Sequence, residues 1–293
     1  MEQKKADDQQ KLLQNNSKSN FTHFFKNPVA LIALIIVLFL ALVAVAVSIL
    51  SYYGIEWPMN PNETHLDARL LQPSLEHWIG TDHLGRDVFS RMLHGTVISM
   101  TVGFTAVAVS LSIGVSIGAV AGYCGGKIDQ ILMRSVDALL CFPTFFLILT
   151  AVALLGPSLI NIIVVIGLIS WTGTARLVRA EFLTLRETEY VYAARILGQR
   201  WWKLIIRHML PNAAAVILIT AILGIPEAIL AEAGLSFLGF GVQPPQATWG
   251  NIIADGKNYF LDAWWLIFFP GLAILMTALS FYLLGDALRE VAE

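Results

Sequence analysis

The sequence predicts an all-α polytopic membrane protein with six transmembrane helices. Three observations support this fold class. Of the 293 residues, 56% are hydrophobic and only 14% are charged, whereas a soluble domain carries about 25% charged residues. Apolar runs recur along the chain that are long enough to cross a bilayer, which takes about 20 helical residues. Lys and Arg gather between alternate runs, a distribution typical of membrane proteins.

The first apolar run, at about residues 29–52, predicts a retained first transmembrane helix with outer bounds 28–53. A cleaved signal peptide has a shorter apolar core that lies closer to the N-terminus. Residues 1–27, before the run, are rich in Lys, Gln and Asn. This composition predicts a disordered cytoplasmic tail.

Residues 54–93 are predicted to form an extracytoplasmic loop that is acidic on balance. Gly80 suits a turn, and Thr81 or Asp82 is expected to cap the helix that leads into the second span. The loop contains three histidines, but their spacing is not that of a metal site. No metal is therefore expected here.

The second span is predicted at about residues 95–122. Gly114, Gly118 and Gly122 recur every four residues, and such a stripe favours close packing against another helix. The same stretch fits G-x-S-x-G around Ser116, the pattern of a serine-hydrolase nucleophile. His94 would lie about five turns away along the same helix, so an intramembrane serine hydrolase is only a distant alternative.

The third and fourth spans are predicted at about residues 136–155 and 158–178. Only Gly156 to Ser158 separate them, which predicts a tight helical hairpin. Asp137 follows Arg134 by three residues near the inner end of the third span. An ion pair within the helix is the favoured interpretation of this spacing.

Residues 185–211 are predicted to form a basic hairpin of two short helical pieces that meet at Gly198. Pro211 is expected to end the second piece before the fifth span. The spacing places Arg200, Lys203 and Arg207 on one helix face, and the neighbouring face holds Trp201, Leu204, Ile205 and Met209. From the residues alone, the piece is either an interfacial helix that holds anionic lipid headgroups or a docking site for a cytoplasmic partner.

The fifth and sixth spans are predicted at about residues 213–233 and 264–285. Glu227 and Glu232 lie in the outer part of the fifth span, beside Pro226, which is expected to kink the helix. Ionisable residues inside spans are functional candidates, so either glutamate could line a translocation pathway. The alternative is a structural hydrogen bond to the loop after Gly234.

The distribution of Lys and Arg predicts the orientation of the chain. If the N-terminus is cytoplasmic, the outer segments hold only Arg69, Arg86, Arg91 and Lys257, and the other 15 of the 19 bases lie inside. Bases favour the cytoplasmic side. Both termini and the hairpin are therefore predicted to be cytoplasmic.

Four stretches carry a family resemblance. Ala193-Ala194, Gly198 and Leu210-Pro211 keep the spacing of the motif E-A-A, three residues, G, nine residues, I-x-L-P, with Tyr192 at the Glu position and His208 at the Ile position. The other three are "HWIGTDHLGRDVFSRMLHG" (77–95), "AEAGLSFLGFGVQPPQATWGNII" (231–253) and "GDALRE" (285–290). Together they resemble the ABC importer permeases of the dipeptide, oligopeptide and nickel family, especially the dipeptide-permease C type.

The resemblance implies the transmembrane domain of a type I ABC importer, the MetI-like fold. Residues 94–288 would form the core five-helix permease domain, including the cytoplasmic coupling hairpin 185–211. The hairpin would dock on an ATPase through Tyr192, Ala193, Ala194, Gly198, Arg200, Lys203, Arg207, Leu210 and Pro211. The implied partners are a homologous second permease, two ATP-binding subunits, an extracytoplasmic solute-binding protein and membrane lipid, with no nucleic acid. The implied location is a bacterial inner or plasma membrane.

The sequence contains no P-loop, which requires G-x-x-x-x-G-K-[ST]. Gly126-Lys127 comes closest, but Ile128 follows where Ser or Thr is required. The chain is therefore expected to be a transporter subunit without a cofactor of its own, and ATP and Mg would be used by partner subunits. The resemblance implies di- or oligopeptide cargo, with nickel or a metal chelate as the alternative. A secondary transporter that works without an ATPase is a distant alternative.

Overall fold

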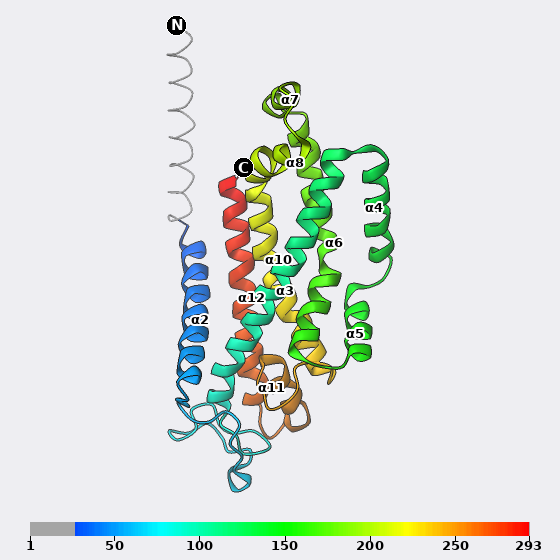
Figure 1. Ribbon diagram of the computed structural model, residues 1–293. Helices are drawn as coiled ribbons and strands as arrows, with labels where there is room; N and C mark the ends of the chain where they lie inside the picture. The colour runs from blue at the N-terminus through cyan, green and yellow to red at the C-terminus, as the bar shows by residue number, and fades with distance from the viewer. Residues whose placement is uncertain (1–26, 293) are drawn as a thin grey trace.

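The structure is a computed structural model that describes residues 27–292. Within this range it is all-helical, and the sole β-type contact is an isolated bridge between Thr81 and Asp87. The predicted all-α membrane fold is confirmed. Almost all of the predicted N-terminal tail lies outside the described residues. Five helices are long and apolar enough to cross a membrane: α2 (Pro28–Tyr52), α3 (Val88–Cys124), α6 (Leu159–Arg186), α10 (Ala214–Phe237) and α12 (Trp265–Ala292) (Figure 1).

The predicted third span is broken into two helices. α4 (Gly126–Leu140) and α5 (Thr144–Leu155) are bent by 80° relative to each other, and counting them as one span gives six. The prediction of one continuous helix over residues 136–155 was therefore wrong. Pro143 explains the break, because a proline disfavours the helical conformation of the residue before it. The tight connection after α5 is as predicted, with Ser158 capping α6 by accepting from the Asn161 N–H.

Helix ends follow local capping chemistry. The Asn27 side chain accepts from the N–H of Val29 at 3.0 Å, and α2 starts where predicted. α3 starts earlier than predicted, because Asp87 is its cap and accepts from the Ser90 N–H at 2.8 Å. The expectation that Thr81 or Asp82 would cap this helix was wrong. Asp82 instead accepts from backbone N–H groups within its own turn.

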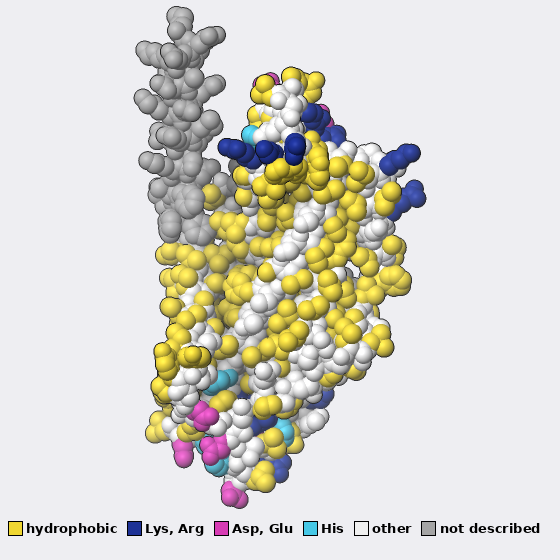
Figure 2. Space-filling view, viewed as in Figure 1, with side chains coloured by type: hydrophobic (Ala, Val, Ile, Leu, Met, Phe, Trp, Pro, Cys, Tyr) yellow, Lys and Arg dark blue, Asp and Glu magenta, His cyan; other side chains and the backbone are white. Residues whose placement is uncertain are grey.

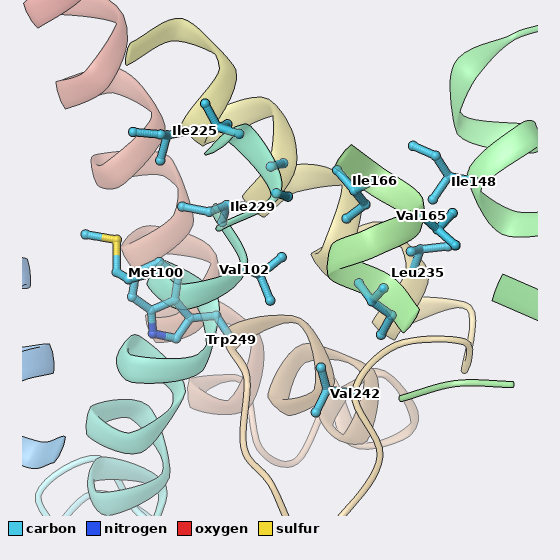
Figure 3. Close-up of a cluster of buried hydrophobic side chains, with 14 of the residues drawn as sticks. Met100, Val102, Ile148, Val165, Ile166, Ile225, Ile229, Leu235, Val242 and Trp249 are labelled. Carbon is cyan, nitrogen blue, oxygen red and sulfur yellow. The ribbon is translucent and has the colours of Figure 1, made fainter. Parts of the chain in front are cut away.

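The centre of the molecule is the crossing of α3 and α6, with α10 against α3 and α5 beside α6 (Figure 1). Their buried side chains form the main apolar cluster shown in Figure 3, which also includes Trp249 of the short helix α11 (Trp249–Gly256). α2 is peripheral. It packs on α12 and α3, and its buried residues are only Ala30, Ala33 and Val47.

The two ends of the bundle differ in structure and charge. The loop end holds residues 54–87, with the 3-10 helix η1 (Leu66–Ala68), α11 and the 3-10 helix η3 (Lys257–Tyr259). The hairpin end holds α7 (Glu189–Ile196) and α8 (Trp201–Leu204). In Figure 2, Lys and Arg side chains gather at the hairpin end, above a broad apolar belt, and acidic side chains gather at the loop end.

Candidate functional site

The hairpin projects beyond the ends of the membrane-spanning helices (Figure 1). α6 continues to Arg186, the chain reverses at Glu187 and Thr188, and α7 follows. The predicted split at Gly198 is present, and Gly198 has a φ of +74°, in the left-handed region that favours glycine. A Cβ atom there would have no neighbour within 4 Å. Backbone conformation, and not crowding within the chain, is therefore what requires glycine at the bend.

The second piece of the hairpin continues past Pro211 and ends at Asn212. α8 is followed by a π-helical turn, η2 (Ile205–Met209), then by α9 (Leu210–Asn212), and Ala213 separates α9 from α10. The piece was expected to end at Pro211 before the fifth span, and it ends one residue later with Pro211 inside α9. Proline is tolerated in the first turn of a helix, where its missing N–H has no partner to lose, and the π-helical turn changes the bonding just before it.

Apolar side chains anchor the hairpin to the bundle. The hairpin contributes buried residues from both of its pieces, and they pack on residues of α3, α6 and the start of α10. The members of this hairpin anchor are Val191, Ile205 and Met209 against Ala119, Val178, Phe182 and Ala213. The guanidinium of Arg195 adds a cation–π contact, 5.4 Å from the centre of the Tyr123 ring in α3. The hairpin is therefore fixed to the α3–α6 crossing.

The outer part of α7 is apolar and uncovered. Tyr192, Ile196 and Leu197 are 61%, 72% and 86% exposed, and Ala193 beside them is also exposed. We call these four residues and Gly198 the hairpin tip. Ala194 is half-buried. Large apolar side chains that gather in a projecting element mark an interaction surface.

The three bases after the bend are all exposed, and within residues 27–292 none of them forms an ion pair. Lys203 and Arg207 lie in the helical segment, but Arg200 precedes it in extended backbone. The prediction of one helix face for all three was wrong for Arg200, because the turn after Gly198 leaves it at the cap position. Trp201 is 53% exposed and does not join the buried Leu204, Ile205 and Met209.

The glycine stripe of α3 lies against α6. A Cβ atom at any of the three glycines would clash with an atom of the facing helix. The distances are 2.6 Å in each case: from Gly114 to Thr174 Cβ, from Gly118 to the Ala175 carbonyl oxygen and from Gly122 to Phe182 Cβ. The helices that carry the hairpin anchor are thus in backbone contact.

Ser116 has no catalytic neighbour in the described part of the chain. Its hydroxyl is exposed and donates to the Ser112 carbonyl oxygen at 2.7 Å. A ring nitrogen of His94 lies 3.0 Å from the Ser90 carbonyl oxygen, near the start of the same helix. A nucleophile requires a base within hydrogen-bond reach, and this pair is separated by most of the length of α3.

The two glutamates of the fifth span lie in different environments. α10 continues through Pro226 without a break. Glu227 is exposed, and no ion pair reaches it from the described residues. Glu232 is fully buried and accepts from the Ser236 hydroxyl at 2.6 Å. Ser236 is two residues after Gly234, at the end of α10, and Thr248 in the following loop also hydrogen-bonds the Glu232 side chain. Of the two pathway candidates, only Glu227 lies on a surface.

Two ion pairs connect α4 to α6. Asp137 lies 2.5 Å from Arg176, and Asp129 accepts two hydrogen bonds from Arg179. The expected pair of Asp137 with Arg134 was wrong, because Asp137 faces the neighbouring helix. The partners in these two pairs are 39 and 50 residues apart along the chain. No local spacing pattern in the sequence therefore indicates them.

A buried charged cluster holds the loop end together. Arg86 contacts Asp82 at 2.6 Å and Asp255 of α11 at 3.0 Å, and Arg91 of α3 is only 1% exposed between the same two carboxylates. Asp82, His83 and Asp255 lie close enough to hold a cation. The two guanidiniums already balance both carboxylates, which favours a charge-neutral structural cluster. No local pattern in the sequence indicates this cluster, because Asp255 lies 169 residues after Arg86.

Comparisons with known proteins identify the family of this chain. Residues 114–293 match the family of binding-protein-dependent transport system inner membrane components. Residues 18–73 match the N-terminal transmembrane domain of oligopeptide transport permease C. The dipeptide transport system permease protein DppC of Bacillus subtilis is 40% identical over 269 residues, 92% of this chain and 82% of the relative. The nickel transport system permease protein NikC of Escherichia coli is 39% identical over 253 residues, 86% of this chain and 91% of the relative.

Proposed function

This chain belongs to the family of binding-protein-dependent transport system inner membrane components, and from that premise we propose that it forms half of the translocation pathway of an ATP-driven importer of di- and oligopeptides. The chain is a multi-pass membrane protein and a permease subunit, not an enzyme. Its dipeptide relatives cover most of its length. The resemblance of four separate stretches to the dipeptide, oligopeptide and nickel permeases agrees with this membership.

The observation that carries the proposal is the contrast between the hairpin anchor and the hairpin tip. The anchor is buried against α3 and α6. Tyr192, Ile196 and Leu197 are exposed, and α7 lies beyond the ends of the spans (Figure 1). A partner that covers the tip can push on the hairpin and move the α3–α6 crossing with it. We assign this tip to the docking surface for an ATP-binding subunit.

The remaining subunits follow from the same proposal. A homologous second permease would complete the pathway, two ATP-binding subunits would use ATP and Mg, and an extracytoplasmic solute-binding protein would deliver the cargo. The hairpin end, where the bases gather (Figure 2), would then face the cytoplasm, as bases favour that side. Both termini would also be cytoplasmic.

Glu227 is the pathway candidate in this arrangement. Its carboxylate is exposed about 20 Å along α10 from Ala214, at about 1.5 Å per residue, and therefore near the middle of the span. A charged side chain at such depth faces a water-filled cavity or another subunit and not lipid. A carboxylate there suits the ammonium group of a peptide.

A nickel or metal-chelate importer is the second candidate function. The nickel permease relative is 39% identical and the dipeptide relative 40%, so identity does not separate the two cargoes. Uptake of a labelled dipeptide and of nickel by cells with and without this chain separates them. Loss of nickel uptake alone would replace peptide by metal as the cargo.

Crosslinking from the hairpin tip tests the docking assignment. Cys124 and Cys141 are exposed and would first be replaced by serine, and Ala193→Cys would then carry the crosslinker. We expect a crosslink to an ATP-binding protein, while Ser116→Cys, exposed within the span, should give none. Transport by vesicles that contain this chain and no ATPase would overturn the proposal in favour of a secondary transporter.

A further inference from the structure

The ion pair between Asp137 and Arg176 is unusually exposed for its position. The two side chains are 60% and 52% exposed. The neighbouring pair of Asp129 and Arg179 is much more enclosed, at 13% and 32%. Asp137 lies farther than Asp129 from the hairpin end along α4, and Arg176 lies farther than Arg179 along α6. The pair that lies deeper in the bundle is therefore the more exposed of the two.

The depth of the exposed pair places it in the hydrocarbon region or at its boundary. Arg176 lies about 26 Å along α6 from Leu159, at about 1.5 Å per residue, and the hydrocarbon core is about 30 Å thick. Exposed leucines, Leu168 and Leu177, flank it on α6. Charged side chains at such positions are costly in lipid and face the bundle interior or a water-filled cavity.

The composition of α4 leads to the same conclusion. Val136 is its single buried residue, so nearly all of its surface must be covered by something outside this chain. That surface is amphipathic. Ile128, Ile131, Leu139 and Leu140 are exposed, but Lys127, Gln130, Arg134 and Asp137 recur at helical spacing and form one polar face that is unsuited to lipid. α5, beyond the 80° bend, is almost wholly apolar. The bend therefore separates an apolar helix from an amphipathic one whose polar face is suited to water.

We propose that the surface where α4 meets α6 lines the water-filled part of the translocation pathway, and that Asp137 and Arg176 form a subsite for a zwitterionic cargo. This inference rests on the proposed function and adds a location to it. A free peptide carries one ammonium and one carboxylate group. The Asp137 carboxylate accepts from the first, the Arg176 guanidinium donates to the second, and their mutual pair reforms when the cargo leaves.

Charge balance favours this class of cargo. The empty pair is neutral, and a zwitterion that inserts between its members leaves the site neutral, so no net charge is added in a region of low dielectric. A cargo with a single charge would leave one member of the pair unbalanced, which is costly when the site is partly desolvated. The subsite should thus prefer dipeptides with both ends free over dipeptides with a blocked end.

Thiol accessibility tests the location. In a chain with Cys124→Ser and Cys141→Ser, a charged maleimide should label Arg176→Cys in inside-out vesicles of the whole complex. Leu168→Cys, about two turns away on the exposed side of α6, should remain unlabelled. A non-hydrolysable ATP analogue should slow labelling at position 176 severalfold and leave Lys127→Cys unchanged. If Arg176→Cys is not labelled, the pathway assignment is overturned. It is also overturned if the ATP analogue changes the labelling rate equally at positions 176 and 127.

Transport of alanylalanine and its N-acetylated form tests the subsite. Asp137→Asn should raise the KM for alanylalanine about tenfold, the loss expected for one charge-assisted hydrogen bond, and should remove the preference over the acetylated peptide, which lacks the ammonium group that Asp137 accepts from. The reversed pair, Asp137→Arg with Arg176→Asp, restores the connection of α4 to α6. Full recovery of KM by the reversed pair would show that the residues only join the helices. Co-purification of the ATPase with each variant reports separately on the proposed function.

Discussion

Gly118 of α3 packs against the backbone of Ala175 in α6 so closely that a Cβ atom at Gly118 would lie 2.6 Å from the Ala175 carbonyl oxygen. Gly118→Leu must therefore separate the two helices. Forcing a larger side chain into a packed interior costs about 1–3 kcal/mol. We expect less assembled protein in the membrane and a lower melting temperature in detergent.

Ser116→Ala is the matched control for this substitution, two residues away on the same helix. Among residues 27–292 its hydroxyl bonds only to its own helix, and transport should be nearly unchanged. Loss of activity in Ser116→Ala together with normal assembly of Gly118→Leu would contradict the packing account and revive the hydrolase alternative.

The bend at the hairpin tip gives a second prediction. Gly198→Glu places a side chain at a φ of +74° and adds bulk and charge to the surface assigned to the ATPase. The chain should still insert, because no span changes, but the ATPase should no longer co-purify and transport should fail. The measurement is the ratio of ATPase to permease after purification.

Gly54→Glu separates docking from backbone strain. Gly54 has a φ of +70°, and a Cβ atom there would also have no neighbour within 4 Å, but it lies in the loop at the opposite end. Strain should be similar in both variants, and only Gly198→Glu should lose the ATPase. Equal loss in both would remove the docking assignment.

Neutralising Arg200, Lys203 and Arg207 together should weaken assembly without abolishing it. Each exposed pair with an acidic partner contributes about 1 kcal/mol or less, and salt screens such pairs. We expect ATPase co-purification to fall more steeply with ionic strength in the wild type than in the triple variant. If the bases bind only lipid headgroups, the triple variant should retain the ATPase at every salt concentration.

The orientation is tested with reporter tags. Tags after Asn62 and Pro244, both at the loop end, should report an extracytoplasmic position. Tags after Lys127 and Glu187, both at the hairpin end, should report a cytoplasmic one. A cytoplasmic signal at Asn62 would overturn the proposed orientation.

Local patterns predicted the elements whose causes are local. Asn27 and Pro28 precede a long apolar run, so the start of α2 was readable from the sequence. The glycines at positions 114, 118 and 122 identified the face that packs, and Gly198 identified the bend. The cap and the bend are determined by neighbouring residues, and the glycine stripe marks a packing face by its own spacing, whichever helix it meets.

The features that were missed depend on contacts between distant segments. Asp137 has Arg134 at helical spacing, but its partner is Arg176 in another helix. The break at Pro143 was hidden because the apolar run continues across it. Thr81 or Asp82 was predicted to cap α3, but Asp87 is the cap, and Asp82 pairs with Arg86 in the preceding turn. The spacing of residues in one sequence does not show which of several candidate partners a side chain contacts in the fold.

The charged cluster at the loop end also has a consequence for the order of events during synthesis. Arg86 is translated 169 residues before its partner Asp255, and domains form from the N-terminus first as the chain is made. Until α11 has been translated and has crossed to the loop end, Arg86 and Arg91 share a single carboxylate, that of Asp82. The two guanidiniums stay unbalanced and cannot be buried cheaply during this interval. The loop end therefore closes late in biogenesis, after the fifth span has been inserted.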